Sequence, residues 1–301
     1  MKKVILFLIL GITLLLTACT GGSKFKYVDG KVNIVATTTM LGDVAKQVGG
    51  EHVNVYTLMG VGIDPHSYKP KSSDRLAVKQ ADLVVDNGLH LEAQMGEVLQ
   101  DFAKDSYTGA LTFDKEDVLK DDSNNSDPHV WFNVLLWKKV AIGLSEKLQT
   151  IDVDNKESYQ TLLTNYAKEL DDLERYVKET VEQLSPEKRV LVTAHDAFQY
   201  FAHAYGFEVH AIQGISTETE ASAADIESLA KLVADLKVKA IFVESSIPRE
   251  TIQQVIDSAK VKGHTLNIGG ELYSDSLGNG DDGLYVNAIK HNVDTIVNAL
   301  K

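Results

Sequence analysis

Two copies of the tripeptide Asp-Pro-His occur in this chain, at residues 64–66 and 127–129, although the sequence contains only five prolines. A proline fixes its own φ angle and pushes the residue before it into an extended conformation. Each tripeptide is therefore a stiff corner that presents an imidazole in a fixed direction. One such corner fits an ordinary turn with a histidine facing water, because Asp-Pro begins many turns. Two corners with the same chemistry favour two halves of a metal site.

Two further side chains stand where α/β proteins usually bind ligands, beyond the carboxyl ends of strands. His195 comes directly after the predicted strand 190–193, and Asp275 follows the predicted strand 265–268 in a segment rich in Ser and Asp. Taken alone, His195 fits a structural histidine equally well, and Asp275 fits a turn or a helix cap. Only the combination with the two Asp-Pro-His corners indicates a site.

The two corner histidines occupy comparable positions. His66 lies in a loop after a predicted strand, and His129 precedes Trp131 and Phe132, an aromatic pair that would wall a site against water. We therefore expect His66, His129 and the two side chains above to converge on a cleft between two lobes.

The N-terminus has the pattern of an export signal. Lys2 and Lys3 precede a mostly apolar run, residues 4–16, that is too short to span a bilayer as a stable helix. The run ends in Leu-Thr-Ala-Cys, which resembles a bacterial lipobox, so residues 1–18 are predicted to be a signal peptide and Cys19 to carry the lipid. Residues 19–30 then form a flexible tether. A plain secretory signal with an incidental cysteine is the alternative.

Composition narrows the function classes. Cys19 is the only cysteine, so disulfides and four-thiolate zinc or iron–sulfur sites are excluded, and a metal must be held by histidine, carboxylate or water. Removing the two lysines of the signal segment takes the net charge from −13 to −15, which argues against nucleic-acid binding and fits a domain that meets cations. The mature length exceeds what one core usually organises, so two domains are expected.

Strands alternating with helices over residues 31–150 predict an N-terminal α/β lobe with a parallel sheet. Residues 114–127 are acidic, rich in Asn and Ser, and without periodicity, which is typical of a loop. The predicted strands are 32–37, 53–58 and 81–87, and the predicted helices are 41–48, 73–80, 91–103 and 134–148.

One long helix is predicted over residues 155–184, a stretch that contains neither glycine nor proline. Its apolar residues recur at steps of three and four, as on one face of an amphipathic helix. Ser185-Pro186 ends it. A coiled-coil arm is the alternative, but the apolar stripe drifts from a strict heptad, so we expect a rigid helix that spans the two lobes.

The alternation of strands and helices resumes over residues 188–301, which predicts a C-terminal α/β lobe. The fold class is therefore α/β, with two lobes that each have a mainly parallel sheet flanked by helices, joined by one long rigid α-helix. The predicted strands are 190–193, 209–213, 240–243 and 265–268, and the predicted helices are 197–204, 223–236, 250–261 and 285–300.

Five motifs, taken in order from about residue 32 to the C-terminus, resemble those of the TroA-like family, the metal-binding lipoproteins of bacterial ABC importers for manganese, zinc and iron. The lipobox is part of the resemblance. The motifs are Gly62-Ile63-Asp64-Pro65-His66, Asp127-Pro128-His129-Val130-Trp131, Thr193-Ala194-His195-Asp196-Ala197-Phe198, Val243-Glu244-Ser245-Ser246 and Gly269-Gly270-Glu271-Leu272-Tyr273-Ser274-Asp275-Ser276.

The resemblance implies metal ligands at His66, His129, His195 and Asp275, with two contributed by each lobe. It implies a monomeric receptor, not an enzyme, that is lipid-anchored on the extracytoplasmic face of the cell membrane and delivers metal to a cognate ABC permease and its ATPase. The segment 88–92 also resembles the family, and we interpret His90 and Glu92 as structural or supporting residues. The remaining histidines are interpreted as surface or packing residues: His52, His203, His210, His264 and His291.

Three imidazoles and a carboxylate suit Mn²⁺, Fe²⁺ or Zn²⁺ better than Ca²⁺ or Mg²⁺, which prefer all-oxygen shells. Zinc-dedicated relatives often carry a His-rich acidic loop, whereas residues 114–127 contain no histidine before the second corner. Many manganese members have Glu where this chain has His195, which favours zinc, but others pair the motif Thr-Ala-His-Asp-Ala-Phe with manganese transport. We choose Mn²⁺ as the transported metal, with Zn²⁺ or Fe²⁺ as the alternative.

Two other function classes compete with metal import. A zinc hydrolase would need an open coordination position and a general base, for which Asp196, Glu218 and Glu244 are candidates. A surface adhesin is the second, because relatives have been described that way, but no segment resembles an adhesive module.

Overall fold

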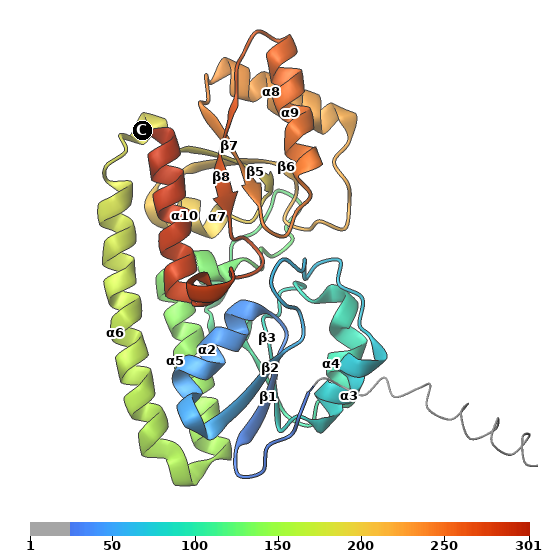
Figure 1. The fold of residues 1–301 in the computed structure, drawn as a ribbon, viewed down its shortest axis with the longest axis vertical. Coiled ribbons are helices and arrows are strands. Elements are labelled where there is room, and N and C mark those ends of the chain that lie inside the picture. The colour runs from blue at the N-terminus through green and yellow to red at the C-terminus, as the bar shows by residue number, and fades with distance from the viewer. Residues whose placement is uncertain (1–24) are drawn as a thin grey trace, which may run out of the picture.

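The computed structural model describes residues 25–301, which form two lobes with a long helix running along one side of both (Figure 1). The predicted signal peptide 1–18, Cys19 and the first part of the tether lie outside the described residues. Among the residues that the structure describes, no helix combines the length and the hydropathy that crossing a bilayer requires. Phe25 is already buried against Tyr56 of the N-terminal lobe.

The N-terminal lobe contains a four-stranded parallel sheet in the order β2-β1-β3-β4. Three of these strands were predicted. The fourth is only three residues long and partly exposed, so it lacks the apolar run by which a strand is found in a sequence. The strands are β1 (Val32–Ala36), β2 (Val53–Thr57), β3 (Leu83–Asp86) and β4 (Ser106–Thr108).

Helices cover both faces of this sheet. The Thr38 hydroxyl caps the first of them by accepting a hydrogen bond from the backbone N–H of Leu41. The predicted helix 91–103 is too long, because its first part is a turn and a short 3₁₀ segment, Ala93–Met95. The helices are α2 (Thr39–Gly49), α3 (Ser72–Gln80), α4 (Gly96–Phe102) and α5 (Val134–Ile151).

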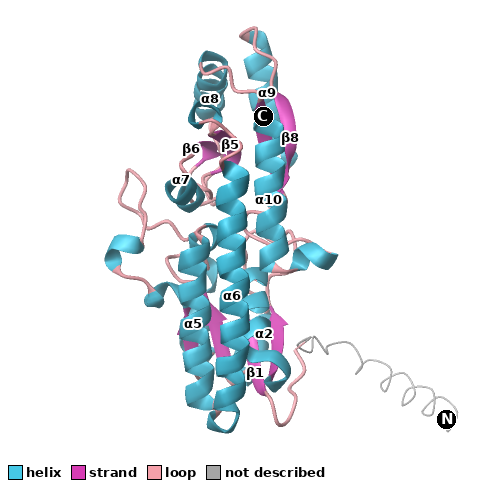
Figure 2. Cartoon of the chain, turned by 90° about the vertical axis from the view of Figure 1, so that its left-hand side faces the viewer, coloured by secondary structure: helices cyan, strands magenta, loops and turns pink. Residues whose placement is uncertain are grey.

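The long helix α6 (Lys156–Val181) confirms the prediction from the apolar stripe. Its 26 residues span roughly 39 Å at 1.5 Å per residue. Figure 2 shows α6 beside α5 and the C-terminal helix α10 (Tyr285–Leu300). Tyr176 on α6 donates to Asp294 on α10. The helix therefore contacts both halves of the molecule.

The C-terminal lobe is built from two parallel strand pairs, β5-β6 and β7-β8, with β5 beside β7. The predicted α7 begins two residues early, because Ala197 and Phe198 belong to the turn after β5. The strands are β5 (Val190–His195), β6 (Glu208–Gln213), β7 (Ala240–Glu244) and β8 (Asn267–Leu272), and the further helices are α7 (Gln199–Tyr205), α8 (Ala223–Asp235) and α9 (Arg249–Val261).

Strand β8 differs from its prediction, because it runs through Gly269 and Gly270 instead of ending before them. These glycines allow α10 and β7 to approach the strand closely. A Cβ atom at Gly269 would lie 2.7 Å from Phe242 Cε1 and 2.9 Å from Ala299 Cβ. Gly270 has a φ of 151°, and a Cβ there would lie 2.4 Å from Thr295 Cγ2. The pair marks close packing, not the end of the strand.

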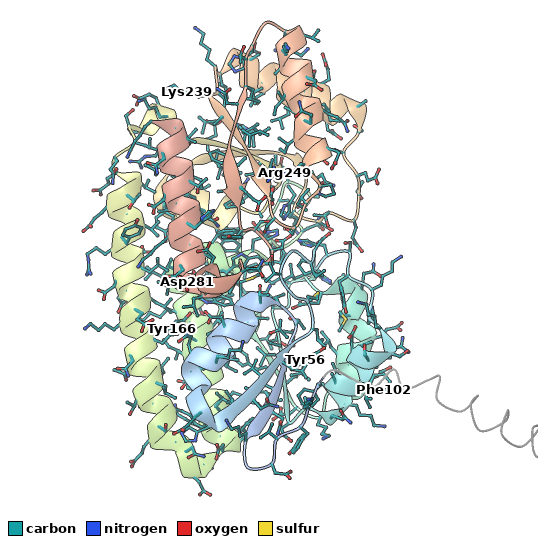
Figure 3. All side chains as sticks on the ribbon, in the orientation of Figure 1. Tyr56, Phe102, Tyr166, Lys239, Arg249 and Asp281 are labelled. Carbon is teal, nitrogen blue, oxygen red and sulfur yellow. The ribbon has the colours of Figure 1, made fainter. Side chains whose placement is uncertain are left out.

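One hydrophobic core continues through both lobes. It includes Ile34 on β1, Trp137 on α5, Leu170 on α6, Phe242 on β7 and Val293 on α10. Smaller separate clusters lie on the outer side of each lobe. Side chains fill the space between the ribbons in both lobes (Figure 3). Of the residues labelled there, Tyr56 and Phe102 belong to the N-terminal lobe, and Lys239 and Arg249 belong to the C-terminal lobe. The lobes are thus joined by packing as well as by the chain.

We predict that Gly269→Ala destabilises the protein by about 1–3 kcal/mol, the usual cost of overpacking a dense interior. The Phe242 ring that the new methyl group meets is fully buried and has no room to move. Gly96→Ala is the control, because a Cβ added there, at the start of α4, would have no atom within 4 Å. Urea unfolding measures both. Equal midpoints for the two variants would contradict the packing argument.

Candidate metal centre

The four side chains singled out by the sequence meet at one place between the lobes. From the N-terminal lobe come His66, in the loop after β2, and His129, just before the 3₁₀ turn Val130–Phe132 that leads into α5. From the C-terminal lobe come His195, the last residue of β5, and Asp275, three residues beyond β8. One potential ligand atom from each residue lies within 4.8 Å of those of the other three.

The separations of these atoms are those of ligands around one small ion. His129 Nε2 lies 3.3 Å from His66 Nε2 and 3.3 Å from His195 Nε2. The Asp275 carboxylate lies 3.2 Å from His195 Nε2, 3.5 Å from His129 Nε2 and 3.8 Å from His66 Nε2. Tetrahedral ligands with bonds of about 2.0–2.1 Å are separated by roughly 3.3–3.4 Å.

This cluster is closed to solvent. The side chain of His66 is 3% exposed, and those of the other three residues are 0% exposed. No backbone N–H or hydroxyl group among the described residues donates a hydrogen bond to the Asp275 carboxylate, which faces the imidazole nitrogens of the cluster. A buried carboxylate is costly unless positive charge compensates it, so these four side chains could hold a divalent metal.

Asp127 orients His129. Its Oδ1 atom accepts hydrogen bonds from the backbone N–H of His129, at 2.9 Å, and from the ring Nδ1, at 2.7 Å. Because the proton then resides on Nδ1, Nε2 presents a lone pair to the cluster. Trp131 packs edge-on against the same ring, at 5.3 Å between centroids. The stiff corner therefore fixes both the direction and the tautomer of its imidazole.

Glu244, at the end of β7, orients His195. Its Oε1 atom accepts from the backbone N–H groups of Ala194 and His195, at 2.8 and 2.9 Å. Its Oε2 atom lies 2.6 Å from His195 Nδ1. Sequence reasoning placed Glu244 in a family motif and offered it as a base for a hydrolase, but it assigned this supporting role neither to Glu244 nor to Asp127. An acid two residues before a histidine was the signal available for Asp127.

The buried charges shift the pKa values of the metal-free cluster in opposite directions. Burial lowers the pKa of His66 to about 4, although the Asp275 carboxylate opposes this. Burial also disfavours charge on His195, but the Asp275 and Glu244 carboxylates raise its pKa well above the usual value. Burial alone would raise the pKa of Asp275, yet the surrounding imidazoles, His195 first, hold it well below its usual range. His195 and Asp275 thus form an ion pair in the absence of metal.

Hydrogen bonds between the lobes surround the cluster. The indole N–H of Trp131 donates to Ser274 O at 2.9 Å, next to Asp275. The backbone N–H of Gly62 donates to Ser276 Oγ at 2.9 Å. The two loops that carry His66 and Asp275 are therefore held together directly.

The other residues discussed from the sequence lie outside the cluster. Glu92 is buried and its carboxylate accepts from Thr37 and from the backbone N–H groups of Asn87 and Gly88, which makes it structural. His90 is exposed. The hydrogen bonds of four other histidines are made elsewhere: His52 to Ser158, His210 to Glu208, His264 to Val238 O and His291 to Glu271 O.

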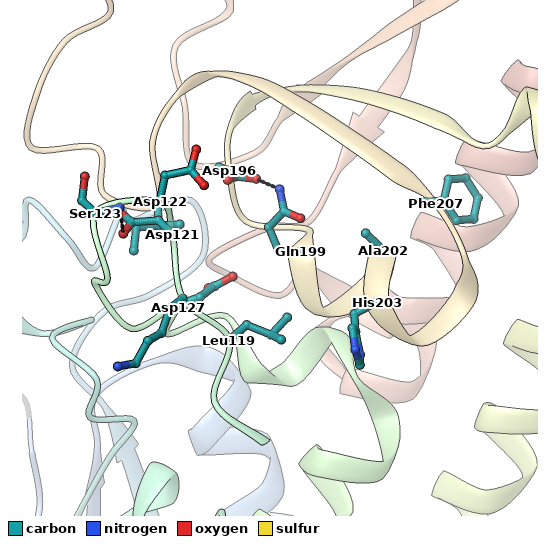
Figure 4. A pocket seen from close by; sticks show the side chains of 12 residues that line it. Leu119, Asp121, Asp122, Ser123, Asp127, Asp196, Gln199, Ala202, His203 and Phe207 are labelled. Atoms are coloured by element: carbon teal, nitrogen blue, oxygen red, sulfur yellow. Dashed lines mark hydrogen bonds between the residues drawn. The ribbon is translucent and has the colours of Figure 1, made fainter. Parts of the chain in front are cut away.

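An acidic cavity of about 580 Å³ lies behind His129 and is lined by Asp121, Asp122, Asp127 and Asp196, among others (Figure 4). Burial raises the pKa of Asp196, whose carboxylate accepts from Gln199. None of the four clustered side chains lines this cavity.

Comparison with known proteins places the chain in a family. The model of the ZnuA family, described as zinc-uptake complex component A, periplasmic, matches residues 34–299. The chain belongs to the ZnuA family. Its predicted resemblance to metal receptors of this kind is thereby confirmed.

Two curated relatives illustrate where this ZnuA-family chain stands. It is 41% identical over 283 residues to the zinc-binding protein TroA of Treponema pallidum (strain Nichols), and the aligned region covers 93% of this chain and 92% of TroA. It is 36% identical over 309 residues to the manganese-binding lipoprotein MntA of Bacillus subtilis (strain 168), and the aligned region covers 100% of both chains. The solved structure of TroA superposes with a TM-score of 0.88 over 90% of this chain and 99% of TroA, which confirms the predicted two-lobed fold.

We predict that Glu244→Ala lowers the free energy of unfolding by about 3–5 kcal/mol, as when one partner of a buried ion pair is removed. Two backbone N–H groups and the His195 imidazole would lose their acceptor. Urea unfolding of metal-free protein measures the loss. Glu220→Ala, at an exposed position, is the control and should change stability by less than about 0.5 kcal/mol. A Glu244 variant as stable as the control would contradict the assigned role.

A second prediction concerns protonation. In metal-free protein, histidine NMR signals should show His195 still protonated at a pH where an ordinary histidine is neutral, and His66 neutral until the pH nears 4. Because the pKa of His66 is lower in the folded than in the unfolded state, its contribution to stability is lost as the pH falls from about 6.5 to 4. His195 has the opposite sign, and its contribution is lost as the pH rises through its raised pKa. Identical titrations near pH 6.5 would contradict the described electrostatics.

Proposed function

We propose that this chain is an extracytoplasmic receptor that captures a divalent transition metal between its two lobes and delivers it to an ABC importer. The observation that carries this proposal is the buried carboxylate of Asp275, which accepts no hydrogen bond from a backbone N–H or hydroxyl group and faces three imidazole nitrogens at 3.2–3.8 Å. The names of the relatives describe binding proteins, and those called PsaA are named substrate-binding lipoproteins of manganese ABC transporters.

His66, His129, His195 and Asp275 would be the ligands. Asp127 and Glu244 support this assignment, because a histidine that binds metal through one ring nitrogen usually donates its other N–H to a carboxylate or carbonyl. With four ligands from the protein, the site is closed, as expected for holding an ion and not for activating water.

We propose Mn²⁺ as the transported metal. The loop before His129 lacks the histidines of zinc-dedicated relatives, and the manganese-binding relative matches along the whole chain. Zn²⁺ is the second candidate, because the ligand separations fit a tetrahedral ion and TroA is named a zinc-binding protein. Fe²⁺ would bind the same ligands. Growth rescue of a transport-deficient strain by manganese or by zinc distinguishes the candidates.

Delivery would involve small movements. The core shared by both lobes and the rigid α6 oppose a wide hinge, so opening would be a slight tilt or a local loop rearrangement. The partners would be a cognate permease, which stabilises the open form, and its ATPase. The protein would act as a monomer on the extracytoplasmic face of the membrane, anchored through a lipid on Cys19.

We predict that His195→Ala weakens binding of both Mn²⁺ and Zn²⁺ by at least about 100-fold, the upper end of the loss seen when mere partners of metal ligands are removed. Isothermal titration at pH 7 measures the affinity. His203→Ala is the matched control, because His203 is exposed and lines the acidic cavity instead of the cluster. Unchanged affinity of the His195 variant for both metals would overturn the proposed function.

A further inference from the structure

We propose that the metal enters and leaves by one route, a cavity of about 510 Å³ between the lobes, and that Glu218 and His90 at this cavity make the first contacts with the hydrated cation. The inference rests on the proposed function and adds to it a transient cation site outside the four ligands. The cavity is lined by Leu89, His90, Ala93, Asn125 and Pro128 of the N-terminal lobe and by Ile215, Ser216 and Glu218 of the C-terminal lobe, among others.

The position of His66 selects this cavity. His66 is the one member of the cluster whose side chain has an exposed fraction above zero, 3%, and it lines this cavity. Two neighbouring cavities, the acidic one of about 580 Å³ and a third of about 440 Å³, border Asp127 and Asp64 but are lined by none of the four cluster residues. The access to the cluster from these cavities therefore leads past the His66 imidazole.

The third cavity is further separated from His66 by a contact between the lobes. Thr217 donates its hydroxyl to Asp64 Oδ2 at 2.6 Å, and Asp64 Oδ1 accepts from the backbone N–H of His66 at 2.9 Å. Glu218 lines the proposed route, whereas Glu220 lines the third cavity. The loop after β6 thus offers one carboxylate to each of these two cavities.

Glu218 is placed to attract and then admit a cation. Its Oε1 atom accepts a hydrogen bond from Gln94 Nε2 at 2.6 Å, which joins the two lobes beside the cavity. The side chain is exposed, so its charge acts on ions in solution. Exposed charges at the rim of a binding cleft mainly change the association rate and its dependence on salt.

His90 supplies a nitrogen ligand on the opposite lobe. It is exposed, lines the cavity and makes no hydrogen bond or ion pair with the rest of the described chain. Leu89 and His90 have φ angles of 53° and 65°, in the left-handed region that non-glycine residues rarely adopt. Glu92 and Asn87 hold this turn, and Asn87 Nδ2 donates to Pro128 O beside His129. An unpaired imidazole is thereby kept at the cavity that ends at His66.

The first test measures association in stopped flow with Zn²⁺ or Mn²⁺ alone, using the fluorescence of Trp131, which packs on the His129 ring. Glu218→Gln should lower the association rate constant by roughly two- to fivefold at low ionic strength and flatten its salt dependence. His90→Ala should also lower it. Glu220→Gln is the matched control, since it removes the same charge from the third cavity, which none of the four cluster residues lines. An unchanged rate for Glu218→Gln, or an equal fall for Glu220→Gln, would overturn the inference.

The second test narrows the route without changing charge. Ala93→Phe should slow association and dissociation by the same factor and leave the dissociation constant unchanged, because a route changes a barrier and not the bound state. Ala221→Phe, in the third cavity, should change neither rate. If Ala93→Phe leaves both rates unchanged, the route is wrong. Wild-type protein that binds no metal at equilibrium would instead overturn the proposed function, so the two failures are distinguishable.

Discussion

The burial of the Asp275 carboxylate among three imidazoles is the constraint on which the rest of the structure depends. An ionised carboxylate in a dry interior is strongly unfavourable unless positive charge compensates it. In the metal-free protein the compensation comes from a protonated His195, whose pKa is raised by Asp275 and Glu244. On the proposed assignment of ligands, a divalent cation would take over this part and His195 would release its proton. The same carboxylate would then stabilise both states, and metal would exchange for a proton.

The carboxylates of Asp127 and Glu244 fix the directions in which two of the imidazoles point. Asp127 and Glu244 each bind the Nδ1 side of one histidine, so both imidazoles turn Nε2 toward Asp275. Their backbone contacts anchor the carboxylates themselves to the second Asp-Pro-His corner and to β5. The proposed ligands are therefore already oriented in the metal-free protein, and binding would require little reorganisation. Preorganisation of this kind removes a cost that flexible ligands would have to meet.

The periodicity of apolar residues and the positions of residues that end helices and strands predicted most of the fold. The stripe from Tyr159 to Val181 defined α6 because one face of a helix repeats every 3.6 residues. Features set by tertiary packing were not predictable in this way. Gly269 and Gly270 have the pattern of a strand end, but α10 requires them inside β8. Glu244 lies 49 residues from His195, so only the pairing of neighbouring strands shows its role. The cluster itself was predicted by motif order, and the aromatic pair after His129 indicated that it would be shielded from water.

The core that runs through both lobes has a consequence for how the protein unfolds. Trp137, Leu170 and Phe242 belong to one packed cluster that both lobes share along α6. Unfolding of one lobe would therefore expose the part of this cluster that belongs to the other lobe. The two lobes then behave as one cooperative unit, and a ligand bound between them protects the entire chain by mass action. Metal occupancy would therefore govern resistance to proteolysis outside the cell membrane. The lifetime of the receptor would then increase with the concentration of metal in its surroundings.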